Sequence, residues 1–441
     1  MLFQLGHFLN YPNFFQLYNW LIENQYKKRE LLFKQQSFYL KRIVKFSYEN
    51  VKFYHKKFKD LNLLPEDIKS IEDLSKLPII DKKIINIHYN EFFPHNLKNI
   101  KYIKKSTGGT TGTPFMYRIT NYERYLAGAL TYRRWENANY NLGDELLIIG
   151  GSSIIPNKNT YFKELITRIT RNAFFLDSFI LSDYYLKNKI EKIIQFRPKF
   201  IYGYPSAIEF FGKWLYDNGY SLNGIKGIVT TSETLLKHIR RNIEKYYGIS
   251  VFDNYGLNDG GISAGECKEK KGFHIDTERS ILEVVDKKNK SVIGKEGEII
   301  ATSLFNYAMP FIRYRTGDIG VLSSKGYSCE CKINLPILEA IKGRTVDILL
   351  TPEGNYVHGW FFLYIFWNYY KGIIAYKIEQ NNKDEINIYI VPEKGLNYKE
   401  TIKKIEFAVK KRVPTWSLNF IITEKITYKN KRKFIVNNIL N

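Results

Sequence analysis

The sequence contains no apolar run long enough to cross a lipid bilayer. Its longest aromatic-rich stretch, residues 360–370, is interrupted by Asn368, whereas about 20 apolar residues are needed for a membrane-spanning helix. The first ten residues have neither a basic region nor a small-residue cleavage site, so no signal peptide is predicted. The expected location is therefore the cytoplasm, where the three cysteines of the chain are not expected to form disulfides.

Acidic residues are too few to balance the basic ones. The 441 residues include 67 Lys and Arg but only 44 Asp and Glu, which gives a formal net charge of +23. Such a charge attracts nucleic acid or an anionic membrane surface. The lysines are scattered, however, and no helix-turn-helix, RNA-recognition or zinc-finger pattern is present. Nucleic-acid binding is therefore kept only as an alternative.

A second alternative is peripheral attraction to acidic phospholipid. Residues 14–32 carry apolar side chains at helical spacing and include Lys27, Lys28 and Arg29, a pattern that also occurs in helices that lie on membranes. An amphipathic helix packed on its own domain explains the same pattern and is favoured.

The composition indicates a folded protein, because 44% of the residues are hydrophobic and 16% are aromatic. The length suits two or three domains. Up to about residue 100 the pattern predicts helices with short turns, one of them beginning at Pro65. Short apolar runs then alternate with helix-like stretches, which predicts an α/β fold with a layered, partly parallel sheet. These predicted strands cover residues 146–149, 200–202, 225–230 and 249–252.

The pattern changes towards the C-terminus. Residues 280–324 predict β-strands joined by hairpin turns, and a smaller domain is expected after residues 343–344. In this domain residues 374–380 and 385–391 are predicted strands, and residues 398–411 a helix. No internal repeat or low-complexity linker is evident.

Residues 106–114 form a loop with three glycines and five hydroxyl side chains. Glycine lets the backbone approach an anion closely, while amide and hydroxyl groups donate hydrogen bonds to phosphate oxygens. The loop is not the common P-loop, because no Lys followed by Ser or Thr comes after its second glycine. A polar turn is the alternative interpretation of this segment alone.

Four further motifs follow in a fixed order: residues 255–259 (YGLND), residues 314–318 (YRTGD), Gly343-Arg344 with Asp347, and Asn430-Lys431. With this ordered set the chain resembles the adenylate-forming ligases. Within them it is similar to the phenylacetate–coenzyme A ligase-like branch, which includes proteins of capsular polysaccharide biosynthesis. The resemblance runs from residues 61–82 through residues 202–206 to the terminal lysine.

The resemblance implies a large N-terminal adenylation domain, residues 1–343, and a small, mobile α+β domain, residues 344–441. It implies that ATP and a small carboxylic acid form an acyl-adenylate and pyrophosphate, with Mg²⁺ assisting. An acceptor then displaces AMP. Coenzyme A is the family default, whereas the capsule-associated branch suggests an amine or a sugar hydroxyl. The oligomeric state and the identity of the acid are not predicted.

The resemblance also assigns roles to individual residues. Asp318 accepts hydrogen bonds from the ribose hydroxyls, Arg344 contacts the nucleotide, and Lys431 swings into the site for adenylation. Arg315 suits either a phosphate or an internal salt bridge. The β- and γ-phosphates are held by the loop residues Ser106, Thr107, Gly108, Gly109, Thr110, Thr111 and Gly112, of which Thr111 is a catalytic candidate. The walls of the nucleotide and carboxylate sites are expected from residues 202–206, Thr231, Ser232, Glu233, Asn254, Tyr255 and Gly256.

The chain departs from the family pattern at three places, of which the first two raise an alternative. Asp259 stands where relatives have a magnesium-binding Glu, so direct coordination could become water-mediated. Val346 replaces an acidic hinge residue. Lys431 lies in a run of basic residues, so Lys429 or Lys433 could act in its place. A member that binds nucleotide without turnover is therefore the non-enzymatic alternative, although Asp318 and Lys431 are retained.

All three cysteines fall in one candidate metal site. Cys267 and His274 flank a short turn, and Cys329 and Cys331 follow later. Three thiolates and one imidazole suit a tetrahedral zinc ion with a structural role, and relatives in the branch carry a similar set. Buried thiols beside an unrelated histidine are the alternative.

Overall fold

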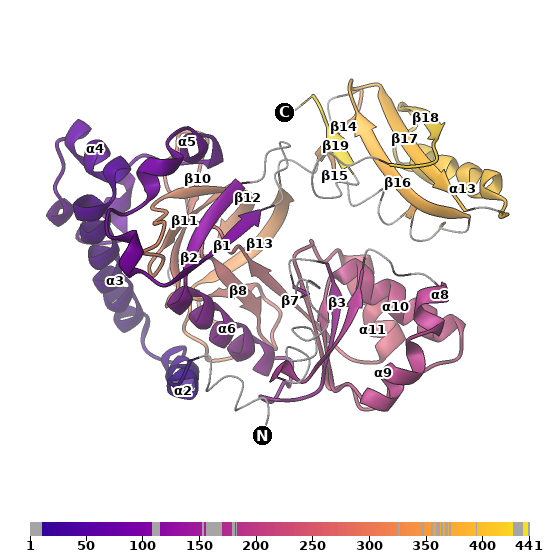
Figure 1. Cartoon of the computed structure of the whole chain (residues 1–441), viewed down its shortest axis with the longest axis horizontal. Coiled ribbons are helices and arrows are strands. Elements are labelled where there is room, and N and C mark those ends of the chain that lie inside the picture. Colours follow the sequence, from indigo (N-terminus) through magenta and orange to yellow (C-terminus); the bar gives the residue numbers. More distant parts are fainter. Residues whose placement is uncertain are drawn as a thin grey trace. The chain divides into compact units, whose positions relative to one another are not determined.

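A computed structural model describes most of the chain, namely residues 11–107, 115–151, 154–155, 170–178, 181, 183–324, 327–344, 348–353, 356–358, 362, 365–366, 369, 372–393, 395–426 and 435–439. The chain divides into two compact units (Figure 1). The first consists of Met1–Lys105 and Tyr117–Lys342, and the second of Ser106–Met116 and Gly343–Asn441.

The N-terminal part of the first unit is helical, as predicted. Its elements are α2 (Phe14–Asn24), α3 (Arg29–Asn50), α4 (Lys52–Asp60), η1 (Pro65–Asp67), η2 (Glu72–Lys76), α5 (Lys82–Ile87), η3 (Tyr89–Phe92) and η4 (Leu97–Asn99). Pro65 begins only a short 3₁₀ helix.

The apolar segment of residues 14–32 is not the single helix that its spacing suggests. It breaks between α2 and α3, where Asn334 donates hydrogen bonds to the carbonyl oxygens of Gln25 and Tyr26 at 2.9 and 3.0 Å. These contacts from a distant part of the chain stabilise the break. The apolar side of α2, with Phe14, Tyr18 and Leu21, is buried.

A parallel sheet forms the centre of the first unit and confirms the predicted α/β class. Its strands are β3 (Leu146–Gly150), β4 (Ala173–Asp177), β5 (Phe200–Gly203), β6 (Gly227–Thr231) and β7 (Val251–Gly256), in the order β4-β3-β5-β6-β7. The accompanying helices are α6 (Asn121–Glu136), α8 (Asp183–Lys187), α9 (Ile190–Phe196), α10 (Pro205–Asp217) and α11 (Lys237–Tyr247).

The same sheet continues beyond β7 in a largely antiparallel part. The chain there forms β8 (Ser263–Glu266), β9 (Phe273–Ile275), β10 (Ser280–Val285), β11 (Glu296–Ser303), β12 (Tyr314–Leu322) and β13 (Ile337–Arg344). A separate two-stranded sheet pairs β1 (Tyr102–Thr107) with β2 (Phe115–Thr120).

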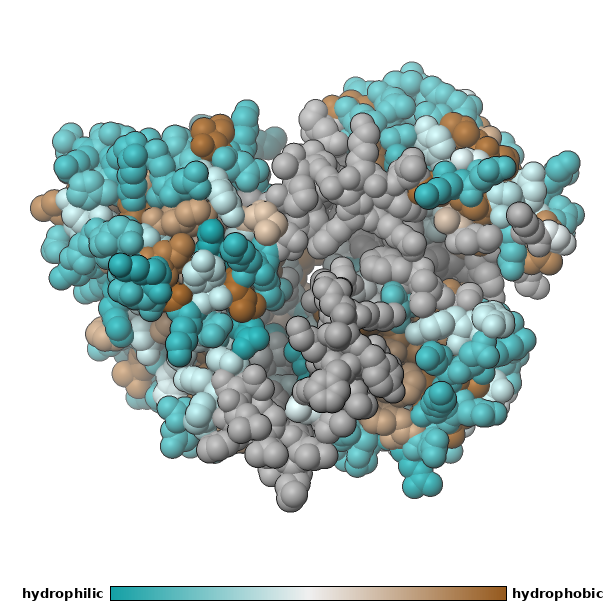
Figure 2. All heavy atoms as spheres, in the orientation of Figure 1, coloured by the Kyte–Doolittle hydropathy of each residue, from teal (hydrophilic) through white to brown (hydrophobic). Residues whose placement is uncertain are grey.

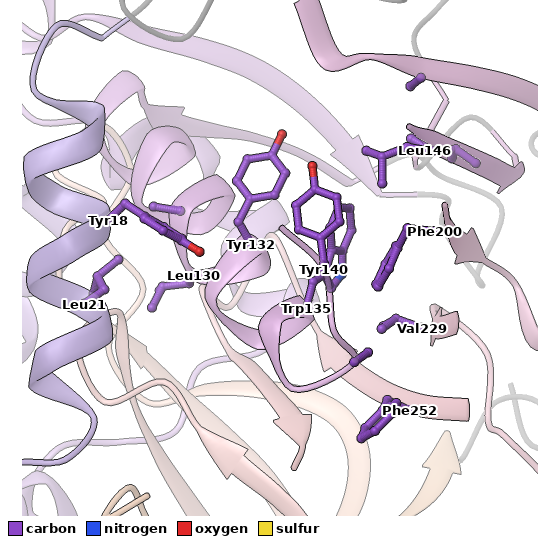
Figure 3. Close-up of a cluster of buried hydrophobic side chains, with 14 of the residues drawn as sticks. Tyr18, Leu21, Leu130, Tyr132, Trp135, Tyr140, Leu146, Phe200, Val229 and Phe252 are labelled. Atoms are coloured by element: carbon purple, nitrogen blue, oxygen red, sulfur yellow. The ribbon is translucent and has the colours of Figure 1, made fainter. Parts of the chain in front are cut away.

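Aromatic side chains fill the space between α2, α6 and the parallel strands (Figure 3). Trp135 of α6 lies 5.3 Å from Phe200 and 4.6 Å from Tyr202, measured between ring centroids. Fully buried aromatic side chains contribute much of the stability of such a core. This packing fixes α6 against β5.

Next to the aromatic core lies a network of buried charges. Arg133 of α6 donates to Asp276 and to Glu278, both at 2.7 Å, and Arg134 contacts Asp276. Asn24 at the end of α2 donates to Glu278 at 2.8 Å. Since buried carboxylates need partners, the network fastens α2 and α6 to the segment before β10.

The second unit has its own core. Its strands are β14 (Ile348–Leu350), β15 (Tyr356–His358), β16 (Ile373–Gln380), β17 (Glu385–Pro392), β18 (Ser417–Ile422) and β19 (Ile435–Asn437), and its helix is α13 (Tyr398–Arg412). The predicted hairpin β16–β17 and the predicted helix are both present. Trp416 is fully buried and donates from Nε1 to the carbonyl oxygen of Leu350 at 2.9 Å.

On the face drawn in Figure 2, hydrophilic residues dominate and hydrophobic residues form small, separate patches. Among the described residues, no helix combines the length and apolar character needed to cross a membrane.

The buried charges predict a large loss of stability when one partner is removed. Arg133→Met should lower the free energy of unfolding by about 3–5 kcal/mol, because Glu278 would remain buried without a cation and Asp276 would keep only Arg134. Urea denaturation measures this loss. The control Lys213→Met, which removes an exposed pair with Asp217, should cost less than about 1 kcal/mol; equal losses in the two variants would contradict this reading.

Candidate functional site

Four parallel strands end at a common edge of the central sheet. Ile149 of β3 pairs with Gly203 of β5, and Gly203 pairs with Thr230 of β6. Thr231 in turn pairs with Asn254 of β7. Ligands of open α/β sheets bind beyond such carboxyl ends. Gly203 cannot be replaced without a shift of the chain, because a Cβ atom there would lie 2.0 Å from the carbonyl oxygen of Ile149.

Glu233 connects two of these strand ends. It follows β6, and its Oε2 accepts a hydrogen bond from the backbone N–H of Ser206 at 3.2 Å and another from the Ser206 hydroxyl. Ser206 lies in the first turn of α10, directly after β5. Burial raises the pKa of Glu233 to about 8. Ser232, just before it, has a left-handed φ of 68° and is exposed, so the backbone turns sharply at the edge.

Two buried donors converge close to β7. Asn254 Nδ2 and Arg134 Nε are both buried, and neither has a hydrogen-bond partner among the described residues. A Cβ atom at Gly265 of β8 would lie 2.5 Å from Asn254 Oδ1 and 2.6 Å from Arg134 Cδ. Both side chains therefore occupy the space that this glycine leaves. Donors of this kind are costly to bury unless a ligand or water accepts from them.

Tyr255 joins two motifs that are far apart in the sequence. Its hydroxyl donates to Oδ2 of Asp318 on β12 at 2.7 Å. The backbone N–H of Asp318 donates to the hydroxyl of Thr316 at 3.1 Å, and the Asp318 side chain is buried. The carboxylate is thus held by Tyr255 of β7, while the backbone of Asp318 is fixed by its own strand.

Asp259 follows β7 and is buried. Its Oδ2 accepts from the hydroxyl of Tyr314 at 2.8 Å and lies 3.6 Å from Lys82 Nζ. The backbone brings Lys82 close, because Ile80 forms a bridge with Tyr314. Lys82 balances the charge of this carboxylate. Arg315, by contrast, forms a salt bridge with Glu298 at 2.8 Å.

Two buried carboxyl groups, those of Asp253 and Glu266, connect neighbouring elements of the sheet close to this edge. Asp253 of β7 accepts from the Thr230 hydroxyl at 2.6 Å, and its backbone N–H donates to Glu266 at 2.8 Å. Arg240 of α11 holds Glu266 through two hydrogen bonds of 2.7 and 2.8 Å. Burial, together with the charge of Glu266, raises the pKa of Asp253 to about 7.

This raised pKa predicts a specific pH dependence of stability. The folded state holds the proton of Asp253 more tightly than the unfolded chain does, so the contribution of this group is full below pH ~4. It should be lost as the pH rises to about 7. Asp253→Asn should therefore gain stability relative to the wild type over this window, by at most about 1.4 kcal/mol per pH unit.

Denaturant titrations of both proteins at several pH values measure the difference. Parallel profiles of stability against pH for the wild type and Asp253→Asn would show that folding does not raise the pKa of Asp253.

Several predicted site residues lie outside the described part of the chain or have no described side chain. Gly108, Gly109, Thr110, Thr111 and Gly112 are outside it, as are Val346 and Lys431. Ser106 and Thr107 end β1, and Arg344 ends β13. Their predicted roles stay predictions.

No sequence motif marks Lys82 or Arg134 as members of the site. Lys82 lies within the segment that carries the resemblance, and Arg134 sits on a helix as one of two adjacent arginines. Their roles depend on contacts with Asp259 and Asp276, far away in the chain. Only a folded structure, or co-variation among relatives, could reveal such pairs.

The predicted metal ligands Cys267, His274, Cys329 and Cys331 do come together. Their ligating atoms all lie within 4.8 Å of one another. The sulfur atoms of Cys267 and Cys329 are 3.6 Å apart, and Cys331 Sγ lies 3.3 Å from His274 Nε2. The other ring nitrogen of His274, Nδ1, lies 3.4 Å from the carbonyl oxygen of Leu335.

This geometry fits a tetrahedral zinc ion. With Zn–S bonds of about 2.3 Å and a Zn–N bond of about 2.0 Å, neighbouring ligand atoms would be roughly 3.5–3.8 Å apart. A disulfide would require about 2.0 Å, and the cysteines are free. Burial lowers the pKa of His274 to about 4, so its imidazole is neutral at pH 7, and a carbonyl oxygen on the second nitrogen is a usual support for a metal-bound histidine.

Comparison with known proteins adds family relationships to this geometry. A family model described as the CapK C-terminal domain matches residues 349–438. Protein CapK of Staphylococcus aureus is 26% identical over 406 residues, which covers 89% of this chain and 86% of the relative. A phenylacetate–coenzyme A ligase of Thermus thermophilus is 27% identical over 342 residues, covering 74% and 73% of the two chains.

Solved structures support the fold. The 2-hydroxyisobutyryl-CoA ligase in its postadenylation state superposes with a TM-score of 0.66 at 16% identity, covering 92% of this chain and 89% of that one. Its open conformation gives a TM-score of 0.58. By these comparisons the chain is similar to the adenylate-forming ligases of the branch that contains the phenylacetate–coenzyme A ligases and CapK.

Proposed function

We propose that the protein is an ATP-dependent ligase that activates a small carboxylic acid. A carboxylate oxygen attacks the α-phosphorus of ATP, the bond to the β-phosphate breaks, and pyrophosphate leaves. An acceptor nucleophile then attacks the acyl carbon of the adenylate and AMP departs. The observation that carries this proposal is the hydrogen bond from Tyr255 to Asp318, which joins two motifs beside the carboxyl edge of the sheet.

The described residues suit the tasks of such a site. Asp318 is fixed through Tyr255 and its own strand, so its carboxylate can accept hydrogen bonds from ribose hydroxyls. Asn254 Nδ2 and Arg134 Nε are buried donors without a described partner, available to a bound acid. Ser106 to Gly112 would hold the phosphates, and Lys431 and Arg344 would complete the charge balance.

Asp259 is the proposed magnesium ligand, in agreement with the preference of Mg²⁺ for oxygen. Bound Mg²⁺ would neutralise phosphate charge during activation. One oxygen of Asp259 already contacts Tyr314 and Lys82. We therefore propose that Lys82 orients this carboxylate and shares its charge with the ion.

Three acceptor classes stay open, namely coenzyme A, an amine and a sugar hydroxyl, and the relatives represent the first two. The name of the phenylacetate–coenzyme A ligases gives coenzyme A as the acceptor. The name of an indoleacetate–lysine synthetase of Pseudomonas savastanoi gives an amine. This synthetase is 31% identical over 148 residues, which cover 32% of this chain and 34% of the relative. Purified acyl-adenylate offered separately to coenzyme A, to amines and to sugars would distinguish the three.

The proposed reaction has a direct test. The protein should exchange labelled pyrophosphate into ATP only when a suitable acid and Mg²⁺ are present. Asp318→Asn should lower the rate of exchange by tenfold or more, because this loss corresponds to roughly the free energy of one charge-assisted hydrogen bond. Absence of exchange across aryl, fatty and amino acids, with ATP still bound, would instead favour a member of the family without turnover.

Lys431 should act in only one half-reaction. Lys431→Ala is expected to slow adenylation by about a hundredfold, which corresponds to about 3 kcal/mol in activation free energy. The reason is that the variant lacks the positive charge that stabilises the transition state. Consumption of added acyl-adenylate with the acceptor should stay near the wild-type rate. Lys429→Ala and Lys433→Ala are matched controls in the same basic run.

If Lys429→Ala or Lys433→Ala slows adenylation and Lys431→Ala does not, the acting lysine is that neighbour and not Lys431. Equal losses in both half-reactions of Lys431→Ala would point to general damage.

We also propose that the four Cys and His residues hold a structural zinc ion. Elemental analysis should find about one zinc per chain. Cys331→Ser should lose both zinc and stability, because metal binding contributes directly to folding. His95→Gln, which changes an exposed histidine outside the cluster, should retain both. A zinc-free protein of full stability would refute the proposal.

A further inference from the structure

Helix α3 has two chemically different faces. Its buried residues recur at helical spacing and pack against the first unit; they are Leu32, Gln36, Leu40, Ile43, Val44 and Ser47. The opposite face is exposed to solvent. It is therefore the exposed residues of α3, and not the buried apolar face of α2, that are available to a partner.

Large apolar side chains lie on this exposed face. Leu31 is 51% exposed, Phe33 39% and Phe38 58%, and Tyr26 just before the helix is 51% exposed. Single exposed apolar residues are normal, but a group of them marks an interaction site. Phe33 and Phe38 line one shallow groove together with Lys34, Lys41 and Glu30, and Leu31 lies seven residues before Phe38, on the same side of the helix.

Basic residues surround these apolar side chains. The exposed basic residues are Lys27, Lys28, Lys34, Lys41, Arg42 and Lys45, against Glu30 and Glu49. The Arg42 guanidinium lies 5.7 Å from the centre of the Phe38 ring. Cations and aromatic rings on one helical face are typical of helices that bind the surface of an anionic membrane.

We propose that the exposed face of α3, with the preceding residues 26–28, docks the protein on an anionic lipid bilayer. Phosphate headgroups would contact the basic side chains, while Leu31 and Phe38, seven residues apart on one side of the helix, would enter the boundary with the acyl chains. Phe33 would lie at the edge of this contact. The proposal is independent of the ligase activity.

Other partners match this face less well. A second copy of the chain would bring two sets of like charges together. Nucleic acid satisfies the basic residues, but it offers no apolar layer for Leu31.

Helix α13 is the competing surface within the chain. Phe407 on it is 71% exposed, and lysines surround it. Glu400 and Glu406 lie on the same helix, however, and Glu400 pairs with Lys404 at 2.6 Å. Phe407 is its one large exposed aromatic residue in the described part of the chain. Helix α3 carries a comparable pair, since Lys45 Nζ lies 3.8 Å from Glu49, so the α3 face is distinguished by its larger number of apolar anchors.

Vesicle co-sedimentation of the full chain tests the proposal. Vesicles of phosphatidylcholine with phosphatidylglycerol should bind the protein, and vesicles of phosphatidylcholine alone should bind it much less. Replacing Lys34, Lys41 and Arg42 by Gln should weaken binding by about a hundredfold, as expected for three charges at the surface. Added salt should weaken the wild-type interaction.

Two matched controls separate the patch from net charge and from exposed aromatic area. Replacing Lys287, Lys288 and Lys290 by Gln removes the same charge from the exposed turn between β10 and β11 and should change binding by less than about threefold. Phe38→Ser should weaken binding, whereas Phe407→Ser should not. Circular dichroism must show that each variant is folded.

Several results would overturn the proposal. They are no sedimentation with anionic vesicles, equal binding to both vesicle types, and equal loss in the patch variant and its charge control. Loss in Phe407→Ser but not in Phe38→Ser would place the docking surface on α13. Self-association abolished by the patch variant, without vesicle binding, would identify a second copy as the partner.

Discussion

Parallel pairing of β3, β5, β6 and β7 is the constraint on which the candidate site depends. Because these strands run in one direction, the chain leaves each of them at the same edge, and the following residues face a common space. Close pairing at Gly203 allows no side chain. The segments after β5, β6 and β7 then supply Ser206, Glu233 and Asp259 from distant parts of the sequence.

Buried polar contacts determine how rigidly this edge is held. Tyr255 binds Asp318, Thr230 binds Asp253, and Arg240 binds Glu266, so each strand that carries a site residue is tied to a neighbouring element. On the other side of the sheet, Arg133 joins α6 to Asp276 and Glu278. A preorganised polar frame of this kind is what charge-neutralising chemistry on ATP requires.

Much of this architecture could be predicted from local sequence. The run Phe200–Tyr202 before Gly203 identifies β5, and the strands β16 and β17 follow from alternating apolar residues. The break between α2 and α3 could not be predicted, because its stabilising contacts come from Asn334. The pairs Lys82–Asp259 and Arg134–Asp276 likewise depend on tertiary contacts across more than a hundred positions.

The most direct test of the central claim follows an oxygen atom. An acid that supports turnover is labelled with heavy oxygen in its carboxylate, and the products of one turnover with ATP are examined by mass spectrometry. If the carboxylate attacks the α-phosphorus, one labelled oxygen must appear in AMP and none in pyrophosphate. Label in inorganic phosphate, or AMP without label, would contradict adenylate formation at this site.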